Sequence, residues 1–478
     1  MRRIFFSLLP ALCLGVLLSC GTGGTDNTEN TESTQPKGKL NVGVVQADMT
    51  PPIGYKVHKI TSDGVWDPLD IKTIVMDQGN CRAALVLADL FFMPQTLSET
   101  VRKLASEKTG IPLSNICVAA THTHADPTCY EEVEAYVQKM NAGNLPASGE
   151  DSYAGLLIEK MVNSVVDAQS KLQPVNLKSG VINIEGISFN RRHLMKDGQV
   201  IMNGGFLNPD IIRAVGPVDP GLGIVLFNSE SDGKTIASFS TFAIQLATIG
   251  DNNTKFSSGF PHFMEQTLQG QFGKEFISVF GEGPSADVNH WDITKPGPQV
   301  GYKESSEPVG RKIGETMLQN LSLLKEGDAS LAVISKTINV PLQTYNNMDL
   351  EWAKSYSDPE ASPILMARAR KVLSLEKLRK KYGDTLPMEI QVFRFNNHTA
   401  TVALPGQLFV ELALEIKKAS PFESTIVLTL ANSHEECIPL RKAYPEGSYE
   451  IIYSLVESGG GEMIADTAIS LLKELKSR

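Results

Sequence analysis

The chain has 478 residues, and 42% of them are hydrophobic, which is enough to bury a substantial core. Its 54 acidic residues outnumber its 44 basic residues, for a formal net charge of −10. Nucleic-acid binding generally needs a basic surface, so this balance argues against a nucleic-acid partner. The spacing of the six cysteines matches neither a zinc finger nor a redox motif.

The N-terminus has the pattern of a bacterial lipoprotein signal peptide. Two arginines precede the apolar run Ile4–Leu18, and the sequence Leu-Leu-Ser-Cys then ends at Cys20, whose thiol would be acylated after cleavage. The run contains Pro10 and is shorter than the ~20 residues that a membrane-spanning helix needs. We therefore predict that residues 1–19 are a signal peptide and that the protein is held in the cell envelope by a lipid on Cys20.

Two further regions follow the signal peptide. Residues 20–38 are predicted to form a lipidated flexible tether, because residues 21–38 contain no large apolar side chain that could join a core. Residues 39–478 show alternating strand and helix patterns without another linker-like break. We predict a single large α/β domain with a mixed central β-sheet flanked by helices.

The predicted elements of this domain run along its whole length. Apolar and β-branched runs indicate strands at Leu40–Val45, Ile71–Met76, Ala83–Ala88, Ile116–Ala120, Ile224–Phe227, Phe276–Phe280, Glu389–Phe395, Thr399–Ala403 and Thr425–Leu430. Amphipathic periodicity indicates helices over residues 97–108, 155–171, 307–325, 364–382, 408–418 and 463–475.

Two histidines follow the predicted buried strand Ile116–Ala120. The sequence Thr-His-Thr-His places His122 and His124 at the carboxyl end of that strand, where α/β proteins usually carry chemistry. In an extended segment, residues i and i+2 point to the same face. Both imidazoles would then contact one metal or one substrate; the alternative is that they are structural histidines.

An ordered set of motifs in the domain resembles the neutral (non-lysosomal) ceramidase family. These motifs are Ala47–Pro52, Ala88–Leu90, Ala120–His124, Asn190–Arg192, Phe280–Gly283, Ala286–Asn289, Leu404–Gly406, Leu430–Asn432, Ile438–Pro439 and Gly447–Glu450. The resemblance implies a ceramidase-like fold over nearly the whole domain and the chemistry of a zinc amidase, in which zinc activates water.

The resemblance also implies which residues should bind zinc, namely two histidines, a glutamate and a tyrosine. His122 matches the first histidine, but Gln245, Gln407 and Cys437 stand at the other three positions. Neutral amides are poor zinc donors. The sequence therefore favours a site without a cofactor, with zinc on His122 as the alternative. His262, His290 and His434 lie near the motifs in the sequence and could supply replacement ligands.

Other polar residues match family positions that contact the substrate. These are His124, Arg191 and Tyr449. We predict catalytic roles for His122, His124, Arg191 and Tyr449, and substrate binding by Gln245, Gln407 and Cys437. A surface salt bridge is the alternative for Arg191, and a packed core position is the alternative for Tyr449.

Two other features allow more than one interpretation. Cys129 and Cys437 both fall near the family pocket, and they could form a disulfide, supply a nucleophile at Cys437, or be ordinary buried cysteines. The basic stretch Ala367–Lys381 is predicted to be the solvated face of a helix, or else a docking surface for an acidic ligand.

Three functions follow from these observations. The first is acid/base cleavage, by β-elimination, of an acidic extracellular polysaccharide in a rebuilt, metal-free site, because glutamine amides and Arg191 suit a substrate carboxylate. The second is zinc-dependent hydrolysis of the amide bond of ceramide or a related N-acyl lipid, as the resemblance implies. The third is a pseudoenzyme that binds a lipid or a glycan.

The lipoprotein prediction can be tested on Cys20 directly. Cells supplied with a palmitate analogue should label the wild-type protein, while Cys20→Ala should abolish the label because no thiol is left to acylate. Equal labelling of the two proteins would contradict the predicted lipidation site.

Overall fold

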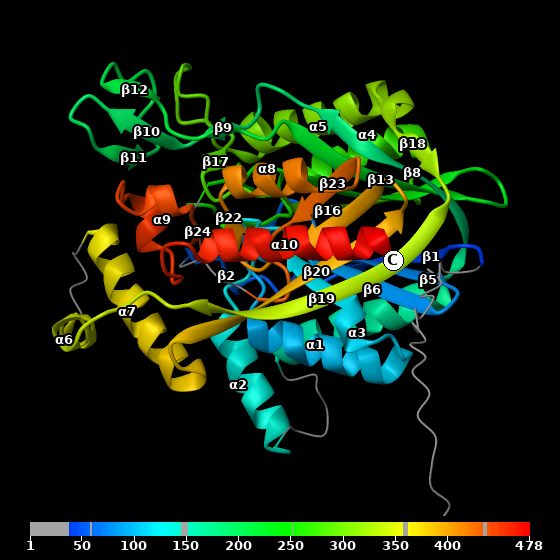
Figure 1. The fold of residues 1–478 in the computed structure, drawn as a ribbon, viewed down its shortest axis with the longest axis horizontal. Helices are drawn as coiled ribbons and strands as arrows, with labels where there is room; N and C mark the ends of the chain where they lie inside the picture. The colour runs from blue at the N-terminus through cyan, green and yellow to red at the C-terminus, as the bar shows by residue number, and fades with distance from the viewer. Residues whose placement is uncertain (1–37, 58–59, 145–151, 251, 357–361, 434–436) are drawn as a thin grey trace, which may run out of the picture. The chain divides into compact units, whose positions relative to one another are not determined.

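The computed structural model describes residues 38–57, 60–144, 152–250, 252–356, 362–433 and 437–478 (Figure 1). Residues 35–478 form one compact unit. The predicted signal peptide and Cys20 lie outside the described residues. Within the described ranges, no helix combines the length and the apolar character that crossing a bilayer requires.

A large mixed sheet forms the centre of the domain. In the described part of the chain it has nine strands, in the order β16-β14-β13-β8-β1-β5-β6-β7 with β18 also paired to β8. Only the β6–β7 and β14–β16 pairs are parallel. The strands are β1 (Asn41–Asp48), β5 (Asp70–Gln78), β6 (Cys81–Ala88), β7 (Ile116–Ala120), β8 (Gln173–Asn183), β13 (Gly221–Ser229), β14 (Thr235–Phe242), β16 (Ile277–Glu282) and β18 (Lys325–Gly327).

A second sheet of four strands packs against the first. Its order is β19-β20-β21-β23, and its strands are β19 (Ala329–Pro341), β20 (Thr385–Asn396), β21 (Thr399–Ala403) and β23 (Ser424–Leu428). One apolar core lies between the two sheets, with Leu85 and Phe239 from the first and Phe393 and Ile426 from the second. Strands that are covered on both faces, such as β6 and β13, have apolar sequences without a clear alternation.

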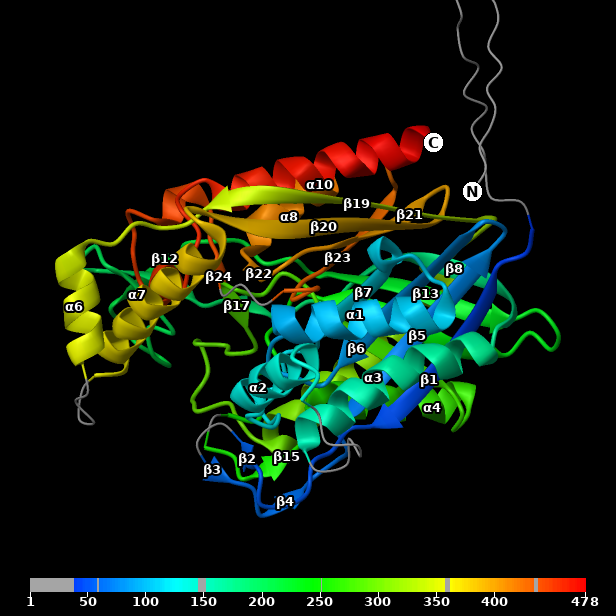
Figure 2. The ribbon, with the colours of Figure 1, turned by 90° about the horizontal axis from the view of Figure 1, so that it is seen from below.

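Helices cover the two outer faces (Figures 1 and 2). On the large sheet, α1 (Gln95–Thr109), α2 (Tyr130–Asn141) and α3 (Tyr153–Ser170) cover one half, while α4 (Phe260–Phe272) and α5 (Glu307–Gln319) cover the other. On the small sheet lie α8 (Val410–Ala419) and α10 (Gly460–Ser477). The result is an α/β/β/α arrangement, which agrees with the predicted α/β class and adds a second sheet to it.

Some predicted boundaries were wrong. The helix predicted over 307–325 ends at Gln319, because the chain then makes a 3-10 turn and joins the sheet as β18. The helix predicted over 408–418 begins only at Val410, since Gln407–Leu408 form the short strand β22, which pairs with β24 (Cys437–Ile438). Prediction also missed β8, β14, β19, α2 and α4.

Loops from the two sheets are hydrogen-bonded to one another where several strands end. Asn432 N donates to Val118 O in β7 (2.7 Å), and Thr429 N donates to Glu282 O at the end of β16 (2.9 Å). The side-chain amide of Asn432 donates to Gln391 in β20, and its carbonyl oxygen accepts from Val118 N. These bonds hold the loops after β7, β16, β21 and β23 together, and the candidate site lies among these loops.

Candidate functional site

One pocket of about 130 Å³ brings together all the site residues predicted within the domain. Its lining is Phe91, Phe92, His122, His124, Arg191, Gln245, Gln407, Leu430, Cys437, Tyr449 and Tyr453. Four of the eleven lining residues are Phe or Tyr, and the polar groups converge on the same space. This composition is typical of a small-molecule site.

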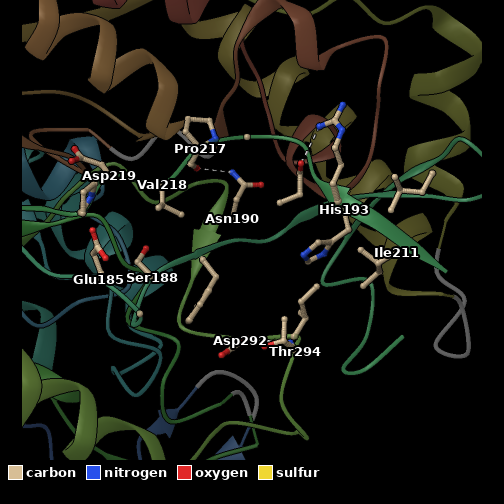
Figure 3. A pocket seen from close by; sticks show the side chains of 18 of the residues that line it. Glu185, Ser188, Asn190, His193, Ile211, Pro217, Val218, Asp219, Asp292 and Thr294 are labelled. Carbon is tan, nitrogen blue, oxygen red and sulfur yellow. Dashed lines mark hydrogen bonds between the residues drawn. The ribbon is translucent and has the colours of Figure 1, made fainter. Parts of the chain in front are cut away.

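A larger cavity of about 1000 Å³ contains none of these residues (Figure 3). It lies beside the small sheet formed by β10 (Arg192–Met195), β11 (Val200–Met202) and β12 (Ile211–Ala214). Two polar side chains at its centre are engaged within the protein: Asn190 Nδ2 donates to Pro217 O and Asp287, and His193 Nδ1 accepts from Gly204 N. The smaller pocket is therefore the better candidate for chemistry.

The backbone of the chain fixes His122 in one orientation. Its φ of 69° lies in the left-handed region, so Thr121–His124 is not the extended segment that we predicted. His122 N donates to Leu90 O (2.9 Å), and Nδ1 lies 2.5 Å from Phe91 O. Because a carbonyl only accepts, Nδ1 carries the proton and Nε2 carries the lone pair. Both His122 and His124 still line the pocket, with ring centroids 5.2 Å apart.

Two glutamine amides contact the imidazole of His122. The Nε2 atom of Gln407 lies 2.5 Å from His122 Nε2, and that of Gln245 lies 3.2 Å from the same atom. The parallel pairing of β22 with β24 places Gln407 directly beside Cys437. The amide N–H groups therefore donate to the lone pair on His122 Nε2. This nitrogen is the atom that would otherwise bind a metal.

A buried ion cluster forms another part of the pocket. Glu450 is fully buried and accepts from Arg191 Nε (3.0 Å) and from Arg192 Nη1 (2.7 Å). Arg191 Nη1 donates to Gln245 Oε1 (2.6 Å), which turns the amide nitrogen of Gln245 toward His122. Burial lowers the pKa of Arg191, but the Glu450 carboxylate more than offsets it, and the net shift is upward. Arg191 thus stays cationic.

One donor of Arg191 is available to a ligand. Among the described residues, its buried Nη2 has no hydrogen-bond partner. The guanidinium lies over the ring of Tyr449, with Cζ 5.4 Å from the centroid, and Tyr449 stacks on Tyr453 at 4.2 Å. A buried cation with an unused N–H group in an aromatic pocket is suited to an anionic oxygen.

Prediction from sequence missed two buried acids near these groups. Glu450 lies in the motif Gly447–Glu450, and Glu282 lies in Phe280–Gly283, but neither was given a role. Burial raises the pKa of Glu282 well above its usual range, although Ser285 Oγ, which donates to it at 2.6 Å, and the charge of Arg191 partly oppose this. Burial therefore favours the protonated form of Glu282. An acidic residue within a motif that resembles the family is the signal that could have pointed to both.

The four residues at the family's zinc positions do not fit zinc. Gln245 Oε1 already accepts from the Arg191 cation, and both amides present N–H groups to His122. A metal ion would also lie close to a buried guanidinium. In the described part of the chain, no three His, Cys, Asp or Glu residues are grouped as a metal would require.

Of the histidines that could supply replacement ligands, the two that the structure describes do not rebuild the site. His262 and His290 are absent from the pocket lining. His262 lies 4.0 Å from Asp67, and His290 Nε2 donates to Gln299 O, with burial lowering its pKa to about 4. His434 lies outside the described residues.

Cys129 does not belong to the pocket. It is a reduced cysteine in the core beneath α1, α2 and α3. Of the interpretations left open by the sequence, the disulfide with Cys437 is not formed, and Cys129 is an ordinary buried cysteine. Burial raises the pKa of the Cys129 thiol far above its usual range, and the acids Asp126 and Glu132 add to this. Cys437 alone of the pair lines the pocket.

Comparison with known proteins assigns the family. Residues 40–290, more than half of the chain, match the family described as neutral/alkaline non-lysosomal ceramidase, N-terminal. The chain belongs to this family. A curated relative, the neutral ceramidase of Pseudomonas aeruginosa, is 25% identical over 208 residues, which are 42% of this chain and 27% of the relative. The match thus spans about a quarter of the length of that relative.

Solved structures of ceramidases share the fold. The neutral ceramidase from Pseudomonas aeruginosa superposes with a TM-score of 0.70 and 16% identity, over 92% of this chain and 75% of the other. A ceramidase described as complexed with C2 gives a TM-score of 0.69 and 15% identity, over 92% of this chain and 76% of the other. This chain therefore has a ceramidase-like fold over nearly the whole domain.

The raised pKa of Glu282 makes a prediction about stability and pH. The folded protein holds this proton more tightly than the unfolded chain, whose glutamate titrates near 4.5. The contribution of Glu282 to stability is thus lost as the pH rises above that value. Glu282→Gln mimics the protonated form, so its melting temperature relative to wild type should increase from about pH 5 to about pH 8. The exposed Glu275→Gln serves as the control, and a constant difference for Glu282→Gln would refute the assignment.

Proposed function

We propose that the pocket is a metal-free acid/base site for a substrate that carries a carboxylate. The observation that supports this most directly is the buried Arg191, which has a cationic N–H group without a partner in the described structure and lines the same pocket as two glutamine amides. These donors would neutralise and orient a carboxylate. The aromatic walls would stack on the apolar face of a sugar ring.

The concrete reaction that we propose is β-elimination from a uronic acid in an acidic extracellular polysaccharide. A carboxylate held by Arg191 makes the proton on the adjacent carbon easier to remove. A pocket base, His124, takes that proton, and the electron pair of the broken C–H bond forms a carbon–carbon double bond. The bond to the leaving oxygen breaks, and that oxygen takes a proton from the hydroxyl of Tyr449.

The second candidate is hydrolysis of the amide bond of ceramide or a related N-acyl lipid. Family membership favours it, and so does the apolar character of the pocket wall. The family reaction by the zinc mechanism would need ligands that this chain has replaced. A pocket that binds a lipid or a glycan without turnover is the third candidate. In each case we propose that the protein acts in the cell envelope, anchored through Cys20.

The first test changes the charge of the pocket. Gln407→Glu should repel a bound carboxylate, since like charges about 4 Å apart cost about 4 kcal/mol at an effective dielectric near 20. Turnover of an acidic polysaccharide, followed by the absorbance of the new double bond, should fall roughly a thousandfold. Gln407→Met removes the amide without adding charge, so it should lose less activity than Gln407→Glu. The same Gln-to-Glu change at the exposed Gln138 should have no effect. Unchanged activity of Gln407→Glu would exclude a carboxylate at this position.

The second test restores family ligands. The native domain should contain well under one zinc per chain, because neutral amides occupy two ligand positions. Gln245→His combined with Gln407→Glu returns two ligands and should raise both the zinc content and the cleavage of a ceramide amide. Stoichiometric zinc in the native domain, lost in His122→Ala, would instead support the amide hydrolase.

A further inference from the structure

Two helices project together at one end of the domain (Figures 1 and 2). The first is α6 (Asn347–Ser355), which begins with a capping box between Asn346 and Asp349. The second is α7 (Pro363–Tyr382), whose first turn is capped by Ser362. We call this pair the α6–α7 hairpin. Helix α7 packs against α9 (Tyr449–Ile452), which carries Tyr449 of the pocket, and α6 packs against α7.

The α6–α7 hairpin exposes large apolar side chains. Met348 is 79% exposed and Ile364 is 54% exposed, and Trp352, Leu365 and Leu373 are also exposed. Met348 and Trp352 are four residues apart on α6, so they share one face of that helix. Each helix buries other residues well, such as Ala353 and Leu375, so the exposed set is not a sign of poor packing. Large apolar side chains exposed on two helices that pack together mark a surface for interaction.

The same hairpin is strongly basic in an acidic protein. Helix α7 contains seven Arg and Lys residues and a single acid, Glu376, whereas the whole chain has a net charge of −10. Arg368 and Arg370 are exposed and make no ion pair with any described residue. Their positive charge is therefore not neutralised within the part of the protein that the structure describes.

We propose that the α6–α7 hairpin is a peripheral docking surface for an anionic lipid bilayer. Apolar side chains enter the boundary between headgroups and acyl chains, while Arg and Lys contact the anionic headgroups. A soluble polyanion would explain the cations, but it gives no reason for exposing Met348 and Ile364. Anionic lipids thus complement the positive charge of the surface, and the acyl-chain region of the bilayer accommodates its apolar side chains.

Docking at this surface would bring the pocket close to the membrane. Lys371 of α7 donates to Ile451 O of α9 (3.0 Å), so the hairpin is joined to the helix that carries Tyr449. Tyr449 and Tyr453 form one wall of the pocket. This surface is separate from the lipid predicted on Cys20, and it does not depend on which reaction the pocket performs.

The test uses residues 35–478, which form one compact unit and lack Cys20. This domain should co-sediment with phosphatidylcholine vesicles that contain phosphatidylglycerol, and added salt should weaken binding because salt screens exposed charges. Arg368→Gln with Arg370→Gln should weaken it about 30-fold, from the usual contribution of each basic residue near an anionic surface. Met348→Asp with Ile364→Asp should also abolish most of the binding.

Matched controls carry the same changes elsewhere. Lys312→Gln with Lys473→Gln removes two exposed cations from α5 and α10, and Leu323→Asp alters an exposed apolar residue outside the hairpin. These variants should bind vesicles like wild type, and all variants should keep the wild-type melting temperature. Equal binding by the hairpin variants, or no binding by the wild-type domain, would overturn the proposal. Loss of heparin binding without loss of vesicle binding would overturn it in favour of a polyanion site.

Discussion

The arrangement of the pocket depends on one buried carboxylate. Glu450 lies between Arg191 and Arg192, and all three side chains are almost inaccessible to solvent. Removing charges from water is costly, and the cost is recovered only when their partners are well placed. Glu450 therefore fixes where Arg191 can point. Through Arg191 it sets the orientation of Gln245, and Gln245 in turn presents its N–H group to His122.

This chain keeps a feature that is typical of metal-binding histidines. In metal sites, the second ring nitrogen of the histidine usually donates to a carbonyl or carboxylate, which fixes the tautomer. Phe91 O performs this role for His122. The lone pair on Nε2 faces two amide N–H groups, and hydrogen bonding there takes the place of coordination. The geometry of a ligand is thus retained, while the neighbouring positions carry neutral amides in place of the family's histidine and glutamate.

Much of the fold and of the candidate site was predictable from the sequence. Strands such as Ile116–Ala120 and Thr399–Ala403 were predicted with correct bounds, because buried β-branched runs ended by polar residues are strong local signals. The convergence of His122, Gln245, Gln407 and Cys437 followed from the order of the family motifs rather than from any local pattern.

Other features were not predictable because they depend on distant contacts. The left-handed backbone of His122 arises from hydrogen bonds to the segment at Leu90 and Phe91, and no local pattern indicates it. The role of Glu450 depends on two arginines about 260 residues earlier. Cys129 lies close in sequence to the histidines. At the start of α2, however, its side chain is buried in the core beneath α1, α2 and α3 and does not line the pocket. Proximity along the chain was a poor guide for that residue.

The hydrogen bonds between the strand-end loops have a consequence for the evolution of this fold. The loops after β7, β16, β21 and β23 are joined mainly by backbone atoms and by Asn432, and none of those bonds uses the side chain of Gln245, Gln407 or Cys437. The framework can therefore accept new side chains at these three positions without losing its shape. A glutamate and a glutamine differ by one polar group at the tip, so few substitutions separate a metal-binding pocket from a hydrogen-bonding one. A lineage with this fold could thus acquire a new reaction while its scaffold stays intact.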